Sequence, residues 1–202
     1  KGDVREPLVV VTRANGLFTG DFVYQSHSTT QGKPALDTLP SAYGADEALT
    51  VSLKDPSSGL TLQLHYGVFV DTDVIVRSSR LVNTSQEAVT VNRLLSAQLD
   101  FDGQFSVTSF TGAWAEEMHR CTTPVQAFFM LSQDAQEDAG ECYGINLIYS
   151  GNHYSAVQTN VYGQTRVVTG INPDMFAYRL AAGEALEAPE AVLCYSDRGF
   201  NS

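Results

Sequence analysis

Cysteine is scarce in this 202-residue chain: only Cys121, Cys142 and Cys194 are present, widely separated and without a Cys-x-x-Cys pair. An odd, scattered set excludes the disulfide framework that supports small secreted domains. We therefore expect free thiols that pack as small apolar side chains in a reducing compartment, which favours the cytoplasm. A metal-binding or catalytic cysteine is the alternative.

Basic residues are also few, with 12 Lys and Arg against 23 Asp and Glu and a formal net charge of −11. This balance excludes a protein that binds nucleic acid through attraction to its phosphates. Long apolar runs are missing too, since LVVV at 8–11 falls far short of the roughly 20 residues that cross a bilayer. We expect neither a nucleic-acid partner nor a membrane partner.

The four histidines lack the short spacing of a metal site: they are His27, His65, His119 and His153. Half-exposed positions on strands or loops are their simplest interpretation. His65 interrupts an apolar segment at a polar-face position, which in a β-sandwich faces either solvent or a sugar-binding concavity. The sequence leaves both open.

Other common site motifs are absent as well. Asp71-Thr72-Asp73 lacks the further oxygen ligands of a calcium loop and is interpreted as a turn. No Gly-x-Ser-x-Gly, phosphate-binding loop or dinucleotide fingerprint occurs. Eight carboxylates near predicted loops are interpreted as solvated: Asp100, Asp102, Glu116, Glu117, Asp134, Glu137, Asp138 and Glu141. We assign no catalytic residue, no cofactor and no metal.

What the chain does have is apolar material, 43% of all residues against 17% charged, which suffices for one sizeable core. Its apolar residues recur with a period of two, as in strands, most clearly at 60–69. A turn-rich connector at 55–59 joins that segment to 49–54 as a hairpin, and two more strands follow at 74–82 and 89–101. Further strands are predicted at 105–110, 128–132, 143–149, 154–160, 166–171 and 191–195.

No segment has the pattern of an amphipathic helix of three turns, and the best candidate, Ala113–Arg120, would form a single short helix. About a dozen strands separated by Gly, Asn and Pro predict an all-β fold, a large two-sheet antiparallel β-sandwich. No internal repeat indicates a propeller or solenoid. The chain opens at Lys1 without a Met and closes just after a strand pattern, so we expect a single domain, 1–202, excised from a longer polypeptide.

Several blocks, in this order, are familiar: FVYQSH at 22–27, GKPAL at 32–36, LPSAY at 39–43, DVIVRSSR at 73–80, GAW at 112–114, GINLIYSGN at 144–152, GINP at 170–173 and PEAVL at 189–193. Together they resemble the non-catalytic N-terminal domain of glycoside hydrolase family 36 α-galactosidases. The resemblance implies a two-sheet β-sandwich that leads into a (β/α)8 barrel, where a retaining mechanism hydrolyses terminal α-linked galactose from raffinose-type oligosaccharides.

That barrel, which needs about 250 residues of alternating strand and helix, is not in this chain. The family's nucleophile lies in a Lys-Trp-Asp segment of the barrel, whereas the single tryptophan, Trp114, lies between Ala113 and Ala115. No catalytic carboxylate is therefore carried over. A family aspartate that contacts galactose from a segment before Lys1 is missing too. Between Pro124 and Phe128 the family has a longer loop, which here is either naturally short or omitted.

For this domain the resemblance implies packing against the barrel of the same polypeptide and assembly into a homotetramer, in a cytoplasmic bacterial enzyme whose substrate is an α-galactoside. Trp114 is the one candidate for a binding residue. It either closes one end of the core, contacts a neighbouring subunit, or stacks on a sugar. Two other functions remain open, a stand-alone carbohydrate-binding sandwich and a sugar-isomerising enzyme with a histidine and a glutamate as acid and base.

Overall fold

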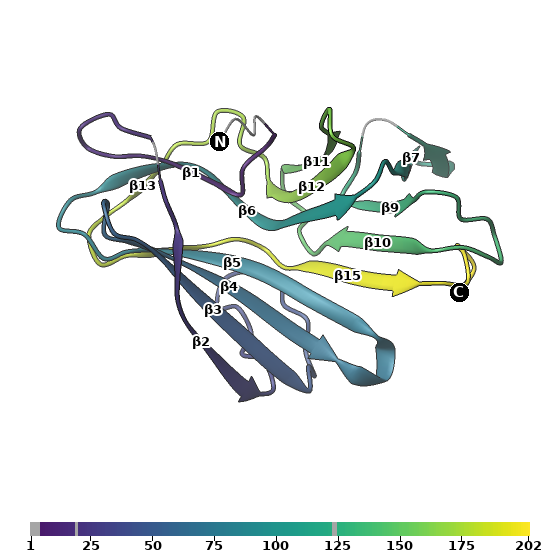
Figure 1. The fold of residues 1–202 in the computed structure, drawn as a ribbon, viewed down its shortest axis with the longest axis horizontal. Coiled ribbons are helices and arrows are strands. Elements are labelled where there is room, and N and C mark those ends of the chain that lie inside the picture. Colours follow the sequence, from purple (N-terminus) through teal and green to yellow (C-terminus); the bar gives the residue numbers. More distant parts are fainter. Residues whose placement is uncertain (1–4, 19, 123–124) are drawn as a thin grey trace.

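Two antiparallel β-sheets stack face to face in the computed structural model, which describes residues 5–18, 20–122 and 125–202 (Figure 1). The ten-stranded sheet runs in spatial order through β2 (Val23–Gln31), β3 (Glu47–Asp55), β4 (Leu60–Phe69), β5 (Val74–Asn83), β15 (Ala191–Ser196), β10 (Cys142–Leu147), β9 (Phe128–Ser132), β7 (Ser106–Ala113) and β8 (Glu116–Cys121), with β14 (Ala185–Glu187) paired beside β5. The five-stranded sheet contains β1 (Val9–Thr12), β6 (Val89–Asp102), β12 (Gln164–Ile171) and β11 (His153–Thr159), with β13 (Tyr178–Leu180) beside β6. The predicted all-β, two-sheet sandwich is confirmed.

Strands appear wherever apolar residues alternate, and the limits of β4 and β9 coincide with the prediction. Five strands were not predicted: β1, β2, β8, β13 and β14. Three of these have only three or four residues, too few for a period to show. The other two, β2 and β8, are almost wholly exposed and carry no apolar face.

Ala113–Arg120, the best candidate for a helix, is not helical, because most of this segment forms β8. Its backbone pairs with β7, Phe110 opposite Arg120 and Thr111 opposite His119. Ala115 and Met118 have positive φ angles of 68° and 59°, which a right-handed helix does not allow. Pairing with a neighbouring strand has overridden the local helix preference of Ala, Glu and Met.

β6 ties the two halves of the molecule together. It is 14 residues long, and it pairs with β1 and β13 along its first part and with β12 along its second. The four consecutive predicted strands exist, but β6 lies in the opposite sheet from β3, β4 and β5. Between the layers, Arg77 Nη1 of β5 donates a 2.5 Å hydrogen bond to the carbonyl of Gln98 on β6.

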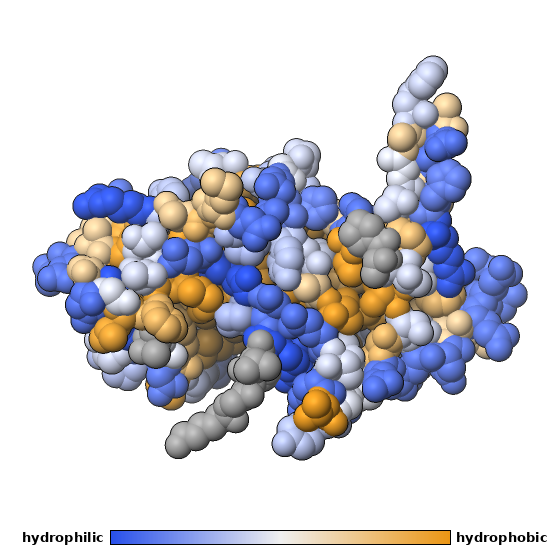
Figure 2. All heavy atoms as spheres, turned by 90° about the horizontal axis from the view of Figure 1, so that it is seen from above, coloured by the Kyte–Doolittle hydropathy of each residue, from blue (hydrophilic) through white to orange (hydrophobic). Residues whose placement is uncertain are grey.

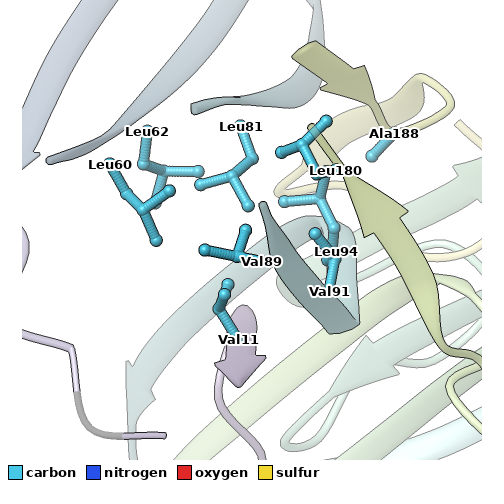
Figure 3. Close-up of a cluster of buried hydrophobic side chains, with 9 residues drawn as sticks. All are labelled: Val11, Leu60, Leu62, Leu81, Val89, Val91, Leu94, Leu180 and Ala188. Atoms are coloured by element: carbon cyan, nitrogen blue, oxygen red, sulfur yellow. The ribbon is translucent and has the colours of Figure 1, made fainter. Parts of the chain in front are cut away.

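The hydrophobic core lies between the sheets in contiguous clusters. The largest joins Leu60, Leu62 and Leu81 of β4 and β5 to side chains from β1, β6 and β13 (Figure 3). Farther along, buried Phe129, Leu131 and Ile145 of β9 and β10 pack against Val167 of β12. Burial of these alternating side chains is what selects the strand registers.

Residues 32–45, called the strap below, cover part of the outer face of the ten-stranded sheet. Leu60 and Leu62 face the core, so the alternation along β4 turns Gly67 outward, opposite Val76 of β5. A Cβ atom on Gly67 would lie 2.8 Å from Lys33 Cδ. Val76 and Ser78 are consequently buried although they point away from the core.

Candidate functional site

Trp114 lies in the turn between β7 and β8, and its side chain is 93% exposed. The hairpin that carries it projects from the sandwich as an arm (Figure 2). Trp114 therefore does not close the core, which excludes one of the three alternatives. An interface contact and a sugar contact remain.

The shape of the arm follows from its backbone. The ladder between β7 and β8 shifts register between Thr111 and Ala113. At Gly112 a Cβ atom would lie 2.8 Å from the Glu116 carbonyl oxygen and 2.8 Å from Glu117 Cα, so only glycine fits this close approach. The irregular pairing turns the tip away from a flat sheet edge.

The root of the arm is anchored by ring contacts. Phe110 of β7 stacks on Phe128 of β9 with 5.5 Å between the ring centroids. The Arg120 guanidinium lies 5.5 Å from the centroid of the Phe200 ring, and Arg120 Nη2 donates a 3.1 Å hydrogen bond to Thr108 Oγ1. The base is therefore fixed while Trp114 is presented to solvent.

The side chains along the arm combine apolar and charged groups. Met118 is 65% exposed, and Glu116, Glu117 and His119 are exposed as well. Indole offers a large apolar area together with one N–H donor, the usual properties of an interface anchor or of a sugar-stacking platform. An exposed indole beside charged side chains gives the arm the chemistry of binding.

A cavity of about 700 Å³ lies on the outer face beside the root of the arm, lined by Phe128, Met130, Cys142, Gly144 and Cys194 among others. The three cysteines are free. We expected all three to be buried, but Cys121 is half-buried and Cys194 is exposed. Only Cys142 is buried; its pKa is raised by burial and by the neighbouring Cys194, and its Sγ donates to the Gly199 carbonyl at 3.3 Å.

The four histidines lie in different places. His27 on β2 and His119 on β8 are exposed, and His153 begins β11 half-buried. His65 lies on the outward face of β4, where its Nδ1 and the Thr50 hydroxyl share a 3.0 Å hydrogen bond. Burial, followed by the charges of Arg80 and Lys33, lowers its pKa. The hydrogen-bond partner of His65 is thus a hydroxyl, and Glu190, the carboxylate whose charge opposes this shift, is bonded to the strap.

The acidic motif lies at a turn, as predicted. Asp71 belongs to the 3-10 turn η1 (Val70–Thr72), and Asp73 follows it with a left-handed φ of 52°. Both carboxylates are exposed. Within the described residues, no three His, Cys, Asp or Glu side chains gather as a metal site.

Glu190 and Arg77 are buried ionic groups that were not predicted. Glu190, just before β15, accepts hydrogen bonds from Lys33 Nζ, Ser41 Oγ and the Ala42 N–H, all on the strap. Arg77 is buried over the Tyr66 ring, burial lowers its pKa, and its Nε finds no acceptor among the described residues. Both hold segments of the fold together and neither borders the arm.

Part of the shortened loop that we expected between Pro124 and Phe128 lies outside the described residues, which exclude 123 and 124. In the described part of the chain no helix has the length and apolarity to span a bilayer.

Comparison with known proteins identifies the domain. The model of the Glycosyl hydrolase family 36 N-terminal domain matches residues 1–127 and 125–181, two stretches that overlap at 125–127. The curated "Probable alpha-galactosidase C" of Aspergillus flavus is 35% identical over 223 aligned residues, which cover 99% of this chain and 30% of that protein.

Solved structures agree with this match. The alpha-galactosidase of Lactobacillus brevis superposes with a TM-score of 0.92 at 36% identity, covering 98% of this chain and 30% of that one. A variant of the GH36 alpha-galactosidase AgaA from Geobacillus stearothermophilus, crystallised with raffinose, gives 0.91 at 32% identity over 98% of this chain and 31% of that one. The chain thus spans less than a third of these relatives, and it belongs to the glycosyl hydrolase family 36 N-terminal domain family.

Proposed function

We propose that this chain is the non-catalytic N-terminal domain of an α-galactosidase and that its Trp114 arm contacts a neighbouring subunit. The domain packs against a (β/α)8 barrel in the same polypeptide and supports assembly of a homotetramer. The barrel hydrolyses terminal α-linked galactose from raffinose-type oligosaccharides with two carboxylates and retention of configuration. The raffinose complex of a relative supports this substrate class.

One observation carries the subunit contact: an indole that is 93% exposed at the tip of a projecting hairpin. Burial of a large apolar side chain in an interface is favourable because it removes apolar surface from water. The anchored root of the arm also holds the indole in a fixed position for a partner. We therefore favour the interface over the sugar contact. A cytoplasmic, bacterial source is part of the same proposal, and the free cysteines support a reducing compartment.

A stand-alone carbohydrate-binding sandwich is less well supported. Such a module presents a row of aromatic rings to its sugar, whereas the exposed rings here lie on separate segments. Phe18 is in the β1–β2 connection, Tyr43 on the strap, Tyr162 in the β11–β12 turn and Tyr178 on β13. Tyr24 on β2 and Tyr195 on β15 are exposed as well, and Phe128 on β9 is exposed at the root of the arm, where it stacks on Phe110. The exposed rings are thus spread over many elements and do not form one row.

Substitution of Trp114 in the full-length natural polypeptide tests the interface. We expect Trp114→Ala to move the enzyme toward smaller species in size-exclusion chromatography, while Trp114→Phe retains part of the assembly. Subunit stability should not change, because the side chain packs on so little of its own chain. A Trp114→Ala enzyme with the parent's size distribution would refute the interface role.

The sugar contact is tested separately in the present chain. Trp114 is its single tryptophan, so fluorescence excited at a wavelength that the tyrosines do not absorb reports on this residue alone. We expect the emission of a water-exposed indole that neither galactose nor raffinose shifts. A saturable shift with either sugar would replace the interface by a sugar contact.

A further inference from the structure

The connection between β1 and β2 opens with a tight turn at residues 13–17. The Gly16 N–H donates to the Arg13 carbonyl at 2.9 Å, and the Arg13 N–H donates to the Leu17 carbonyl at 2.8 Å. Asn15 and Gly16 at the centre of the turn are both exposed, and Gly16 has a left-handed φ of 82°. This is the single place in the sequence where glycine directly follows asparagine.

An asparagine that precedes glycine is able to react with its own backbone. The backbone nitrogen of the glycine attacks Cγ of the asparagine, a C–N bond forms, ammonia leaves, and a cyclic succinimide remains. Water then opens the ring at one of its two carbonyl groups, which yields aspartate or isoaspartate. The reaction consumes water and releases ammonia, and glycine suits it because no side chain crowds the attacking nitrogen.

The folded turn gives the reacting groups access to each other and to water. A Cβ atom built on Gly16 would meet no other atom within 4 Å, so the space around its backbone is open. Asn15 Oδ1 accepts a 3.1 Å hydrogen bond from the Leu17 N–H, so the carboxamide folds back over the Gly16 peptide. The same donor stabilises the negative charge that develops on Oδ1 as Cγ is attacked.

One hydrogen bond of the turn opposes the reaction. Gly16 has to release its amide proton before its nitrogen attacks, and in the closed turn this N–H donates to the Arg13 carbonyl. Exposed turns open locally while the core stays folded. The rate is therefore set by opening of the turn, and it is lower than in an unstructured peptide of the same sequence.

The other asparagines are less suited to this reaction. Asn83 is 0% exposed, and its Nδ2 donates to the carbonyls of Glu87 and Leu180. Asn172 precedes a proline, whose nitrogen has no proton to release, and Asn160 precedes a β-branched valine. The remaining four precede residues whose side chains crowd the attacking nitrogen: Asn92, Asn146, Asn152 and Asn201.

We propose that Asn15 is a self-modification site, at which the folded chain converts asparagine into aspartate and isoaspartate through a succinimide with Gly16. Water is the only co-reactant. Aspartate keeps the side-chain oxygen that accepts the Leu17 N–H, so the turn persists. Isoaspartate leads the main chain through the former side chain, which lengthens the turn by a methylene group and breaks its hydrogen-bond pattern. Either product adds a negative charge to a formal net charge that is already −11.

Peptide mapping by mass spectrometry, after prolonged incubation of the purified chain at neutral and mildly alkaline pH, tests the site. We expect the peptide that contains Asn15 to gain about one dalton, because NH2 is replaced by OH. Conversion should be faster at the higher pH, because the attacking nitrogen has to lose its proton. An isoaspartate-specific methyltransferase with labelled S-adenosylmethionine should label this same peptide.

Two variants and a matched control sharpen the test. Gly16→Ala places a methyl group beside the attacking nitrogen, and Asn15→Gln requires a larger ring, so both should slow the conversion severalfold. Asn152→Gln removes another exposed asparagine and should convert at residue 15 like the parent.

Three results would overturn the proposal. The first is another asparagine that converts before Asn15. The second is a rate that rises in Gly170→Ala, whose added Cβ would crowd Leu95 and Ser96 in the core, because the reaction would then occur in the unfolded chain. The third is an Asn15 that stays intact in the full-length polypeptide, because the turn would then be closed to water there.

Discussion

Lys33 and Glu190 form a buried ion pair between segments 157 residues apart in sequence. Lys33 Nζ lies 2.5 Å from Glu190 Oε1, and the two side chains are only 7% and 1% exposed. The second carboxylate oxygen accepts the Ala42 N–H at 2.7 Å. A single carboxylate therefore fixes both the beginning and the later part of the strap to the sheet.

Removing the charge of Glu190 should be costly. We expect Glu190→Gln to lower the free energy of unfolding by about 3–5 kcal/mol, because the Lys33 ammonium stays buried without its counter-ion. Urea denaturation measures the loss. Lys33→Met/Glu190→Leu, which removes both charges, should recover most of it.

Glu187→Gln is the matched control for that experiment. Glu187 pairs with Arg80 at 3.3 Å, but both side chains are about one-third exposed, 30% and 37%. An exposed pair contributes less than about 1 kcal/mol. Equal losses in Glu190→Gln and Glu187→Gln would contradict a special role for the buried pair.

His65 should make stability depend on pH. Its pKa is lowered in the folded chain, chiefly by burial, from an unfolded value of about 6.5. Below that value the unfolded chain binds a proton more readily than the folded chain does, so stability falls as pH decreases from about 6.5 to the folded pKa. In His65→Gln the free energy of unfolding, measured over the same pH range, should not show this decrease. If parent and variant lose stability in parallel, the decrease comes from other titrating groups.

Gly170 should not tolerate a side chain. It lies where β12 shifts register against β6, and an added Cβ would lie 2.7 Å from Leu95 Cα and 2.7 Å from the Ser96 nitrogen, both backbone atoms. We expect Gly170→Ala to destabilise the domain by about 1–3 kcal/mol. Gly20→Ala serves as the control, since its Cβ would lie no closer than 3.4 Å to another atom. Equal melting temperatures of the two variants would contradict this prediction, because they would show that the β12 backbone shifts to make room for the methyl group.

The present chain should not release galactose from a chromogenic α-galactoside, because the proposed function places the reaction in the barrel. The assay compares the purified chain with the full-length polypeptide under the same conditions. Turnover that co-purifies with the chain through several separations would show that the sandwich contains its own active site.

The sequence predicted the sandwich because burial imposes alternation on the central strands. Leu60, Leu62 and Leu81 alternate with polar residues and point into the core, so their period of two is visible without a structure. β2 has no such signal, since none of its nine residues is buried. Its pairing depends on β3, which local sequence does not reveal.

The candidate site was predicted only in part. Trp114 could be placed in a loop, but its exposure depends on how far the β7–β8 hairpin extends beyond its neighbours, which is a property of the assembled sheet. The ion pair between Lys33 and Glu190 could not be predicted from the sequence for a related reason. Twelve bases and twenty-three acids allow many pairings, and only the fold selects one.

The strap also sets an order of events during synthesis. Residues 32–45 leave the ribosome early, yet the carboxylate that holds them belongs to Glu190, which is made more than 140 residues later. Contacts so distant in sequence form slowly. Until then the outward side of Val76 lacks its cover, and apolar surface exposed in this way favours association between incomplete chains.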